Sequence, residues 1–226
     1  MDIINFILHI DTFLGTFISQ FGVGTYIILF VVIFIETGLV VTPFLPGDSL
    51  LFAAGALAAQ PPCISTTAGC NPNFQLNVIV LYLVVAAAAV LGDTVNYWIG
   101  HYIGPRAFSG KIRFLKKEYM DRTQAFYEKH GGKTILLARF VPIVRTFAPF
   151  VAGVGQMRYG HFISFNMFGG ILWTALFTFA GFFFGNLPFI QQNFSLVVVT
   201  IVFISVLPMV YEYVKSKRAP KTSPAE

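Results

Sequence analysis

Long apolar runs are the main pattern of the chain, and their lengths predict membrane helices. Residues 76–103 and 161–185 each contain more apolar sequence than the roughly 20 residues that a helix needs to cross a bilayer. Residues 194–214 form a third run of this kind. Toward the end of the first run, Gly100 and Gly104 form a small-xxx-small pair, which favours close packing of another helix. The pattern predicts an all-α polytopic membrane protein.

Proline and glycine interrupt another apolar stretch, residues 24–59, which predicts a helix and a first re-entrant hairpin. Its first part, 24–42, is almost long enough to cross the bilayer, whereas 49–59 is apolar but too short. The interruption consists of Pro43, Pro46 and Gly47. Irregular backbone at membrane depth is tolerated only where protein buries it or it lines a wet cavity. A hairpin that enters and leaves on one side satisfies this condition.

Residues 134–155 repeat the pattern, since proline interrupts their apolar sequence at Pro142 and Pro149. They predict a second re-entrant hairpin. The loop after the first hairpin is expected outside and the loop before the second inside, so the two hairpins would enter from opposite faces. Opposed hairpins in an inverted repeat are a common plan of secondary transporters.

The distribution of positive charge predicts the topology. No Lys or Arg precedes Arg106, and most basic residues then fall in the loop 104–133 and the tail 215–226. The positive-inside rule places both segments, and therefore the C-terminus, in the cytoplasm. Residues 3–22 predict an amphipathic helix in the membrane interface. The orientation of the N-terminus stays open, because no early positive charge decides it.

The loop 60–75 contains no Lys or Arg, so it is expected on the extracytoplasmic side. It carries Cys63 and Cys70. In an oxidising compartment these residues can form a disulfide within a small loop. Two unpaired surface thiols are the alternative.

Composition supports a single membrane domain over residues 1–226. Hydrophobic residues make up 56% of the chain and charged residues 11%, against roughly a quarter charged in soluble domains. Mean hydropathy is +0.72. The net charge of +5 does not indicate nucleic-acid binding, because the positive residues follow the membrane topology.

Charged residues within the apolar segments are the strongest indication of function. They are Glu36, Asp48, Asp93, Arg139 and Arg145. A charge at the centre of a transmembrane helix costs about 2.5–3.5 kcal/mol on insertion scales. A chain that keeps both signs at such depth is expected to use them, and this predicts a transporter.

Each acidic residue has a structural and a functional interpretation. Burial favours the neutral form of Glu36, so it either hydrogen-bonds a neighbouring helix or carries a proton during transport. Asp48 either caps the helix that follows it or contributes charge to a cavity. Asp93 shares a helix face with Asn96 and Tyr97, which indicates either a polar helix–helix contact near the cytoplasmic surface or a functional group.

Arg139 and Arg145 bracket Pro142 in the second hairpin. Arginine stays charged when it is buried, so each residue needs a carboxylate partner or an anionic ligand. A helix break at Pro142 would let both side chains point into one cavity, where their guanidinium groups match the geometry of a phosphate. The pattern predicts a phosphate-binding pair, and static ion pairs with the three carboxylates are the alternative.

The sequence contains no pattern typical of metal or nucleotide binding, because its histidines are scattered and no Walker motif is present. No metal and no cofactor are therefore expected, and the chain is not expected to be an enzyme. A lipid phosphatase would need a catalytic histidine near the arginines, which that segment lacks. An intramembrane protease would need two facing aspartates, and Asp48 with Asp93 is only a weak candidate for such a pair.

Four stretches resemble the DedA family, also called the SNARE-associated or VTT-domain family. They read ETGLVVTPFLPGDSLLFAAGALA, GDTVNYWIG, FYEKHGGKTILLARFVPIVRTFAPFVAG and the run that ends in AGFFFG. The resemblance implies a bacterial inner-membrane protein with two opposed re-entrant hairpins and a role in envelope homeostasis. It also implies return of undecaprenyl phosphate or a phospholipid across the membrane, driven by the proton motive force. The family residues matched are Glu36, Asp48, Arg139 and Arg145.

The expected function is a lipid-phosphate flippase with membrane lipids and protons as partners and with a homo-oligomer left open. Arg139 and Arg145 would bind the phosphate, and Glu36 and Asp48 would hold both arginines in the empty state. Proton uptake on one carboxyl group would favour release. The alternatives are a proton-coupled exporter of small solutes or drugs and a membrane assembly factor whose charges are static pairs.

Overall fold

The computed structural model describes residues 21–39, 47–59, 75–107, 135–136, 139, 142–185, 187–193, 196–197 and 199–201. Every regular element within these residues is a helix, which confirms the all-α fold for this part of the chain. Several predictions lie wholly or mostly outside the described residues: the amphipathic helix at 3–22 except its last two residues, the breaks at Pro43 and Pro46, the two cysteines, most of the basic loop, and most of the run 194–214.

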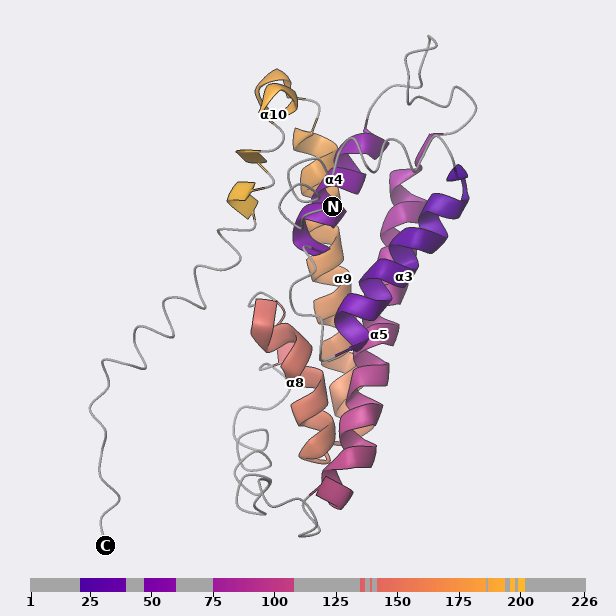
Figure 1. The fold of residues 1–226 in the computed structure, drawn as a ribbon, viewed down its shortest axis with the longest axis vertical. Coiled ribbons are helices and arrows are strands. Elements are labelled where there is room, and N and C mark those ends of the chain that lie inside the picture. The colour runs from indigo at the N-terminus through magenta and orange to yellow at the C-terminus, as the bar shows by residue number, and fades with distance from the viewer. Residues whose placement is uncertain are drawn as a thin grey trace, which may run out of the picture.

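Two long helices, α5 (Val78–Ala107) and α9 (Tyr159–Phe184), run along the long axis of the helix bundle (Figure 1). Both are long and apolar enough to cross a membrane, α5 over Val78–Gly104 and α9 over its whole length. They coincide with the predicted runs 76–103 and 161–185. Helix α5 begins where it does because Asn77 Oδ1 accepts hydrogen bonds from the backbone N–H groups of Ile79 and Val80, at 2.9 and 3.2 Å.

Helix α3 (Gly24–Gly38) lies along the first half of α5. At its start, Tyr26 Oη accepts a hydrogen bond of 2.7 Å from the backbone N–H of Asn77, just before α5. At its end, a Cβ placed on Gly38 would lie 3.4 Å from the Cα of Gly92. Helix α3 therefore ends beside the middle of α5 rather than at its far end.

The two remaining helices near the charges are α4 (Gly47–Ala58) and α8 (Pro142–Val154). Helix α4 packs on α9 and α8 packs on α5. In Figure 1, α4 occupies the upper part of the bundle and α8 the lower part. Each short helix therefore packs on the long helix that belongs to the other half of the sequence.

Glycine permits both of these close crossings. A Cβ on Gly55 of α4 would meet the carbonyl oxygen of Thr178, and a Cβ on Gly181 of α9 would meet that of Phe52. The crossing of α5 and α8 repeats this arrangement. There, Gly100 faces the carbonyl oxygen of Phe150, Gly153 faces that of Tyr97, and Gly104 faces Val154. Small residues at such contacts let helix backbones approach closely.

The structure corrects one predicted break. Gly47 and Pro142 are the first residues of α4 and α8, but Pro149 lies inside α8, which continues to Val154. Pro149 has no backbone N–H, so the carbonyl oxygen of Arg145, four residues earlier, does not receive the usual helical hydrogen bond. Neighbouring helices can supply donors at such places in membranes. Here Asn96 Nδ2 donates to the adjacent carbonyl, that of Thr146, at 2.7 Å.

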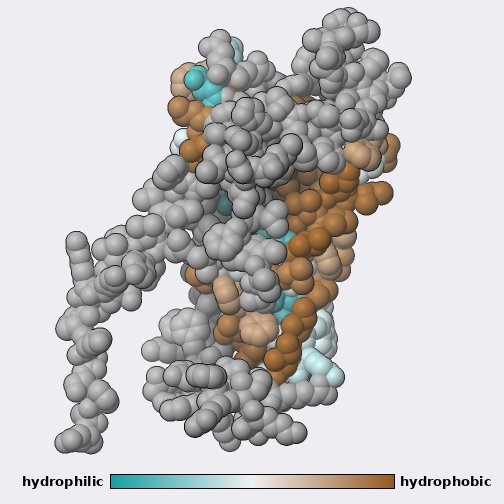
Figure 2. All heavy atoms as spheres, viewed as in Figure 1, coloured by the Kyte–Doolittle hydropathy of each residue, from teal (hydrophilic) through white to brown (hydrophobic). Residues whose placement is uncertain are grey.

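Large apolar side chains cover the outside of the described helices. Brown hydrophobic atoms follow the face of the bundle in Figure 2. The exposed residues include Ile27, Val31, Leu83, Leu91, Phe168, Leu176 and Phe183. The polar side chains Thr37, Asn96, Thr146, Asn166 and Thr174 are buried instead, as are the five charged residues. This inverted distribution suits a bundle surrounded by lipid. The short helix α10 (Pro188–Gln192) follows α9.

Candidate functional site

All five charged residues singled out by the sequence are buried within the helix bundle. Glu36 is fully buried, Asp93 and Arg139 are 3% and 4% exposed, and Asp48 and Arg145 are each 8% exposed. Taking a charge out of water costs several kcal/mol unless partners compensate it. The partners found for each charge therefore decide what the site can do.

Arg145 is shared by two carboxylates. Its Nη1 donates to Asp48 Oδ1 at 2.6 Å, and its Nη2 donates to Glu36 Oε1. Glu36 lies near the end of α3, Asp48 is the second residue of α4, and Arg145 is the fourth residue of α8. We call these three residues the Arg145 triad. It joins three short helices that no other ion pair among the described residues connects.

Helix α4 begins against the Glu36 carboxylate. The backbone N–H of Gly47 donates to Glu36 Oε1 at 3.2 Å, so this carboxylate accepts one of the donors that the first helical turn leaves unpaired. A Cβ on residue 47 would overlap the Glu36 carboxylate. Glycine at this position is therefore required by the close approach of α4 to Glu36.

Trp173 of α9 completes the surroundings of the triad. Its Nε1 donates to Asp48 Oδ1 at 2.9 Å, and its ring centroid lies 5.0 Å from Cζ of Arg145. A guanidinium group within about 6 Å of a ring centroid is attracted by the face of the ring. Trp173 therefore contacts a carboxylate and the cation at the same time.

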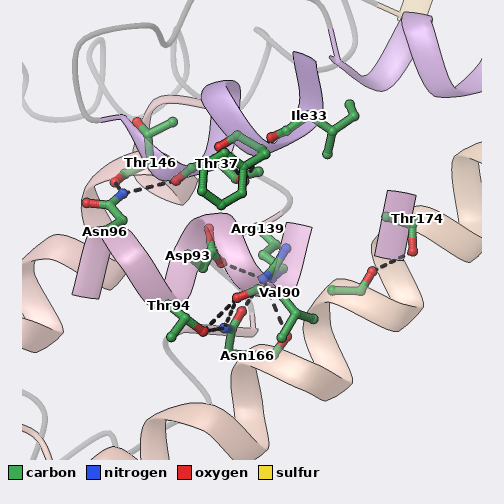
Figure 3. A network of polar contacts seen from close by, with 12 residues as sticks. Ile33, Thr37, Val90, Asp93, Thr94, Asn96, Arg139, Thr146, Asn166 and Thr174 are labelled. Carbon is green, nitrogen blue, oxygen red and sulfur yellow. Dashed lines mark hydrogen bonds and ion pairs between the residues drawn. The ribbon is translucent and has the colours of Figure 1, made fainter. Parts of the chain in front are cut away.

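Arg139 belongs to a second centre, shown in Figure 3. Its Nη2 donates to Asp93 Oδ2 on α5 and to Asn166 Oδ1 on α9. Asn166 is fixed in turn, because its Nδ2 donates to the carbonyl oxygen of Val90 at 3.0 Å. A Cβ on Gly169 would lie 2.9 Å from Cδ of Arg139, so the arginine stem lies against a glycine surface of α9.

Asn96 links the two short helices α3 and α8 to α5. Its Nδ2 donates to the carbonyl oxygen of Thr37 at 3.1 Å and to that of Thr146 at 2.7 Å (Figure 3). Thr37 and Thr146 are the direct sequence neighbours of Glu36 and Arg145. One buried amide therefore holds the backbone on both sides of the Arg145 triad.

The charges of the two centres do not balance in the same way. With its carboxylates ionised, the Arg145 triad carries one net negative charge, whereas Asp93 and Arg139 cancel. Among the side chains of the five charged residues, three buried polar atoms have no hydrogen-bond partner within the described part of the chain: Glu36 Oε2, Arg139 Nε and Arg145 Nε. The site therefore keeps donors for an anion and an oxygen that can take a proton. No cluster of three metal-ligating side chains occurs among the described residues.

The pairing differs from the expectation that Glu36 and Asp48 hold both arginines. They hold Arg145, whereas Arg139 pairs with Asp93. Asp93 is available to Arg139 because it is buried against the other helices from the middle of α5. Because Arg139 precedes Pro142, the first residue of α8, it points to α5 and α9, while Arg145 points to α3 and α4.

Two residues of the site were not predicted from the sequence. Trp173 is 1% exposed, whereas the other tryptophan, Trp98, is 50% exposed. Asn166 is fully buried. A lone amide within the apolar run 161–185 was the available signal, because polar side chains at membrane depth need partners.

Comparison with known proteins gives the family. The family model described as VTT domain matches residues 45–183, a stretch that contains every residue of the two centres except Glu36. The chain is 52% identical over 218 residues to the protein DedA of Escherichia coli K12, covering 96% of this chain and 94% of that protein.

Two further relatives are more distant. A membrane protein of Mycobacterium tuberculosis, named as uncharacterized, is 45% identical over 197 residues, covering 87% of this chain and 82% of the relative. The inner membrane protein YghB of Escherichia coli K12 is 31% identical over 185 residues, covering 81% and 77%. No solved structure matches the chain significantly. The chain belongs to the DedA family of VTT-domain membrane proteins.

Proposed function

We propose that this protein moves a lipid phosphate, such as undecaprenyl phosphate or a phospholipid, across the membrane. The observation that carries the proposal is the Arg145 triad, in which one buried cation is held by two carboxylates and keeps an unused Nε donor. A guanidinium group matches a phosphate bidentately. A phosphate can therefore replace a carboxylate on Arg145 without leaving the cation unpaired.

The ends of two helices support an anion at this place. Asp48 and Arg145 lie in the first turns of α4 and α8, so the N-termini of both helices point toward the triad. Each N-terminus carries roughly half a positive charge. Interrupted helices whose N-termini face an anionic substrate group are typical of secondary transporters.

We infer two opposed re-entrant hairpins from the same contacts. Helix α3 extends from the start of α5 to its middle, and α4 packs against the end of α9 that contains Gly181 and Gly185. Helix α8 instead lies against the end of α5 that contains Gly100 and Gly104. The hairpins would then enter from opposite faces and meet at the charges, in an inverted repeat.

The transport cycle follows from these positions. A phosphate headgroup entering between α4 and α8 would take Arg145 from Asp48 or Glu36, while its acyl or prenyl tail stays in lipid. Arg139 would supply its free Nε as a second donor. Return of the carboxylates to Arg145 would release the headgroup on the other side.

Proton coupling follows from the charge of the triad. When a phosphate takes the place of one carboxylate on Arg145, the negative charge around this arginine increases, and a proton on one carboxyl group relieves the repulsion. Glu36 Oε2 has no hydrogen-bond partner among the described residues and is the atom we assign to this proton. Protons and membrane lipids are thus the proposed partners, and neither a cofactor nor enzymatic activity is part of the proposal.

A second candidate is proton-coupled export of a small solute. The second carboxylate on Arg145 supports it, because this carboxylate could carry a proton. An assembly factor with static ion pairs is a third, weaker candidate, because static pairing does not explain a second carboxylate on one arginine.

The relative YghB is named an inner membrane protein. We propose the same membrane for this chain, with its C-terminus in the cytoplasm.

The test is transport in vesicles of phosphatidylethanolamine and phosphatidylglycerol that contain the purified protein. The probe is a fluorescent polyprenyl monophosphate, and quenching from outside reports its transfer between leaflets. We expect transfer with the wild-type protein, acceleration by a pH gradient, and no transfer above empty vesicles with Arg145→Gln. The matched control is Arg158→Gln, which removes an exposed arginine. Equal transfer by wild type and empty vesicles would overturn the proposal.

A further inference from the structure

Trp173 contacts both partners of one ion pair, and packing alone does not require this. Its Nε1–H donates to the same Asp48 oxygen, Oδ1, that accepts from Arg145. Its ring lies against the guanidinium group of that arginine. Both contacts are buried, since Trp173 is 1% exposed.

We propose that Trp173 is a positioning residue that holds Asp48 and Arg145 in place while Arg145 exchanges a carboxylate for the phosphate of the substrate. The inference rests on the proposed function and extends it to a residue on α9, outside both proposed hairpins. In this role the indole N–H holds Asp48, and the face of the indole ring holds Arg145. The two contacts have separate consequences.

The N–H contact acts on the state in which phosphate is bound. When Arg145 turns to the phosphate, Asp48 Oδ1 loses the guanidinium donor but keeps the Trp173 donor. Loss of a donor to a buried carboxylate is costly, because hydrogen bonds to charged groups are the stronger ones. The indole N–H therefore lowers the barrier to exchange and returns Asp48 to one position after release.

The ring contact acts on the cation in every state. The attraction between a guanidinium group and an aromatic face does not depend on which anion the cation binds. Trp173 therefore keeps Arg145 near the meeting point of α4 and α8 while its anionic partner changes. A flexible guanidinium without this surface would be free to follow the phosphate.

The first experiment uses Trp173 as its own reporter. The chain contains two tryptophans, so Trp98→Phe leaves Trp173 as the only one. Trp98 is half exposed and belongs to neither charged centre. In detergent, we expect the fluorescence emission of Trp173 to change as a short-chain polyprenyl monophosphate is added, and to reach a plateau at high concentration. The uncharged polyprenol should leave it unchanged, and Arg145→Gln should abolish the response.

The outcomes separate this inference from the proposed function. If Trp98→Phe protein transfers the fluorescent lipid phosphate but the Trp173 emission is unchanged, the positioning role is wrong and the transport proposal stands. If it neither transfers the lipid nor responds in emission, both are wrong. A saturable response without transfer supports the positioning role and overturns transport.

The second experiment is a double-mutant cycle on transport. Trp173→Phe keeps an aromatic ring and removes the N–H donor, so we expect the maximal transfer rate to fall roughly tenfold, the value of one hydrogen bond to a charged group. The apparent KM should change much less, since Arg145 keeps a ring surface. With Asp48→Asn already present, the same substitution should change the rate by less than about twofold, because coupled residues are not additive.

A packing role gives a different result. The loss from Trp173→Phe would then be the same in both backgrounds, and it would follow the thermal midpoint of the purified protein. That outcome would overturn the inference. The matched control is Trp98→Phe, which should leave the transfer rate and the midpoint near their wild-type values.

Discussion

Arg145 Nη1 and Asp48 Oδ1 lie 2.6 Å apart, although the two residues are 97 positions apart in the sequence. This ion pair joins the first turn of α4 to the first turn of α8, helices that pack on different long helices. Because the same arginine also holds Glu36 at the end of α3, one side chain connects three short helices. Any change in its anionic partner must alter how these helices are held together.

The first prediction concerns Arg145 itself. Arg145→Gln removes the cation shared by two buried carboxylates, and breaking a buried pair in this way costs about 3–5 kcal/mol where no proton neutralises the remaining charge. We expect loss of lipid transfer together with a lower thermal midpoint at neutral pH. Because protonation removes the repulsion, the deficit in midpoint should shrink as the pH falls.

Arg145→Lys distinguishes charge from geometry. Lysine restores the positive charge but lacks the planar fork that binds two oxygens at once. We expect the thermal midpoint to recover largely while transfer stays well below wild type. Full recovery of transfer by lysine would show that a point charge suffices and that bidentate binding of phosphate is not required.

The second prediction separates the two centres by charge exchange. Asp93 and Arg139 form a neutral pair, so the double variant Asp93→Arg with Arg139→Asp keeps both charges at similar places. We expect each single variant to lower the thermal midpoint and the double variant to regain part of the loss. Transfer should stay defective in the double variant, because the arginine no longer precedes α8. Restored transfer would mean that Arg139 is a structural partner only.

The third prediction follows from the extra carboxylate of the triad. Glu36→Gln leaves Asp48 and Arg145 as a neutral pair, and no proton is then needed to balance the charge. We expect transfer by this variant to lose its acceleration by a pH gradient while some downhill transfer remains. The measurement is the transfer rate of the fluorescent monophosphate with and without the gradient. Acceleration equal to that of wild type would exclude Glu36 as the proton carrier.

The long helices could be predicted from sequence because apolar length alone specifies them. The runs 76–103 and 161–185 coincide with α5 and α9 to within a few residues. The five charges could also be selected, since charge in an apolar run is conspicuous. The place of Pro149 inside α8 could not be predicted, because a membrane helix can continue through a proline where local backbone adjustment or surrounding groups compensate for the missing donor.

The pairing of the charges could not be predicted. Arg145 and Glu36 are 109 positions apart, and Arg139 and Asp93 are 46 apart. Which carboxylate meets which arginine depends on how α4 and α8 cross the long helices. Contacts between glycines and backbone carbonyl groups set those crossings. The spacing of apolar residues along the sequence does not predict such contacts. Trp173 was missed for the same reason, because burial of its indole follows from packing.

The fourth prediction concerns Asn96, which donates to the carbonyl oxygens of Thr37 and Thr146. Asn96→Leu keeps a similar side-chain volume and removes both donors, and each neutral hydrogen bond is worth about 0.5–1.5 kcal/mol. We expect a lower thermal midpoint and reduced transfer, because the backbone beside Glu36 and Arg145 is no longer held by α5. The matched control is Ser164→Ala, which removes an exposed hydroxyl group that donates to the carbonyl oxygen of Gly160 within its own helix. An unchanged midpoint in Asn96→Leu would show that these bonds do not hold the helices.

The fifth prediction tests the crossing of α5 and α8 with two glycine substitutions. A Cβ on Gly100 would meet the carbonyl oxygen of Phe150, whereas a Cβ on Gly160 has no neighbouring atom within 4 Å. Overpacking of this kind costs about 1–3 kcal/mol. Replacing a helical glycine by alanine otherwise gains about 0.4–1 kcal/mol, mainly by restricting the unfolded chain. We therefore expect Gly100→Ala to lower the thermal midpoint in detergent and Gly160→Ala to leave it unchanged or raise it. Because α8 carries Arg145, Gly100→Ala should also reduce lipid transfer. Equal thermal midpoints for the two variants would show that α8 does not pack closely against α5 at Gly100.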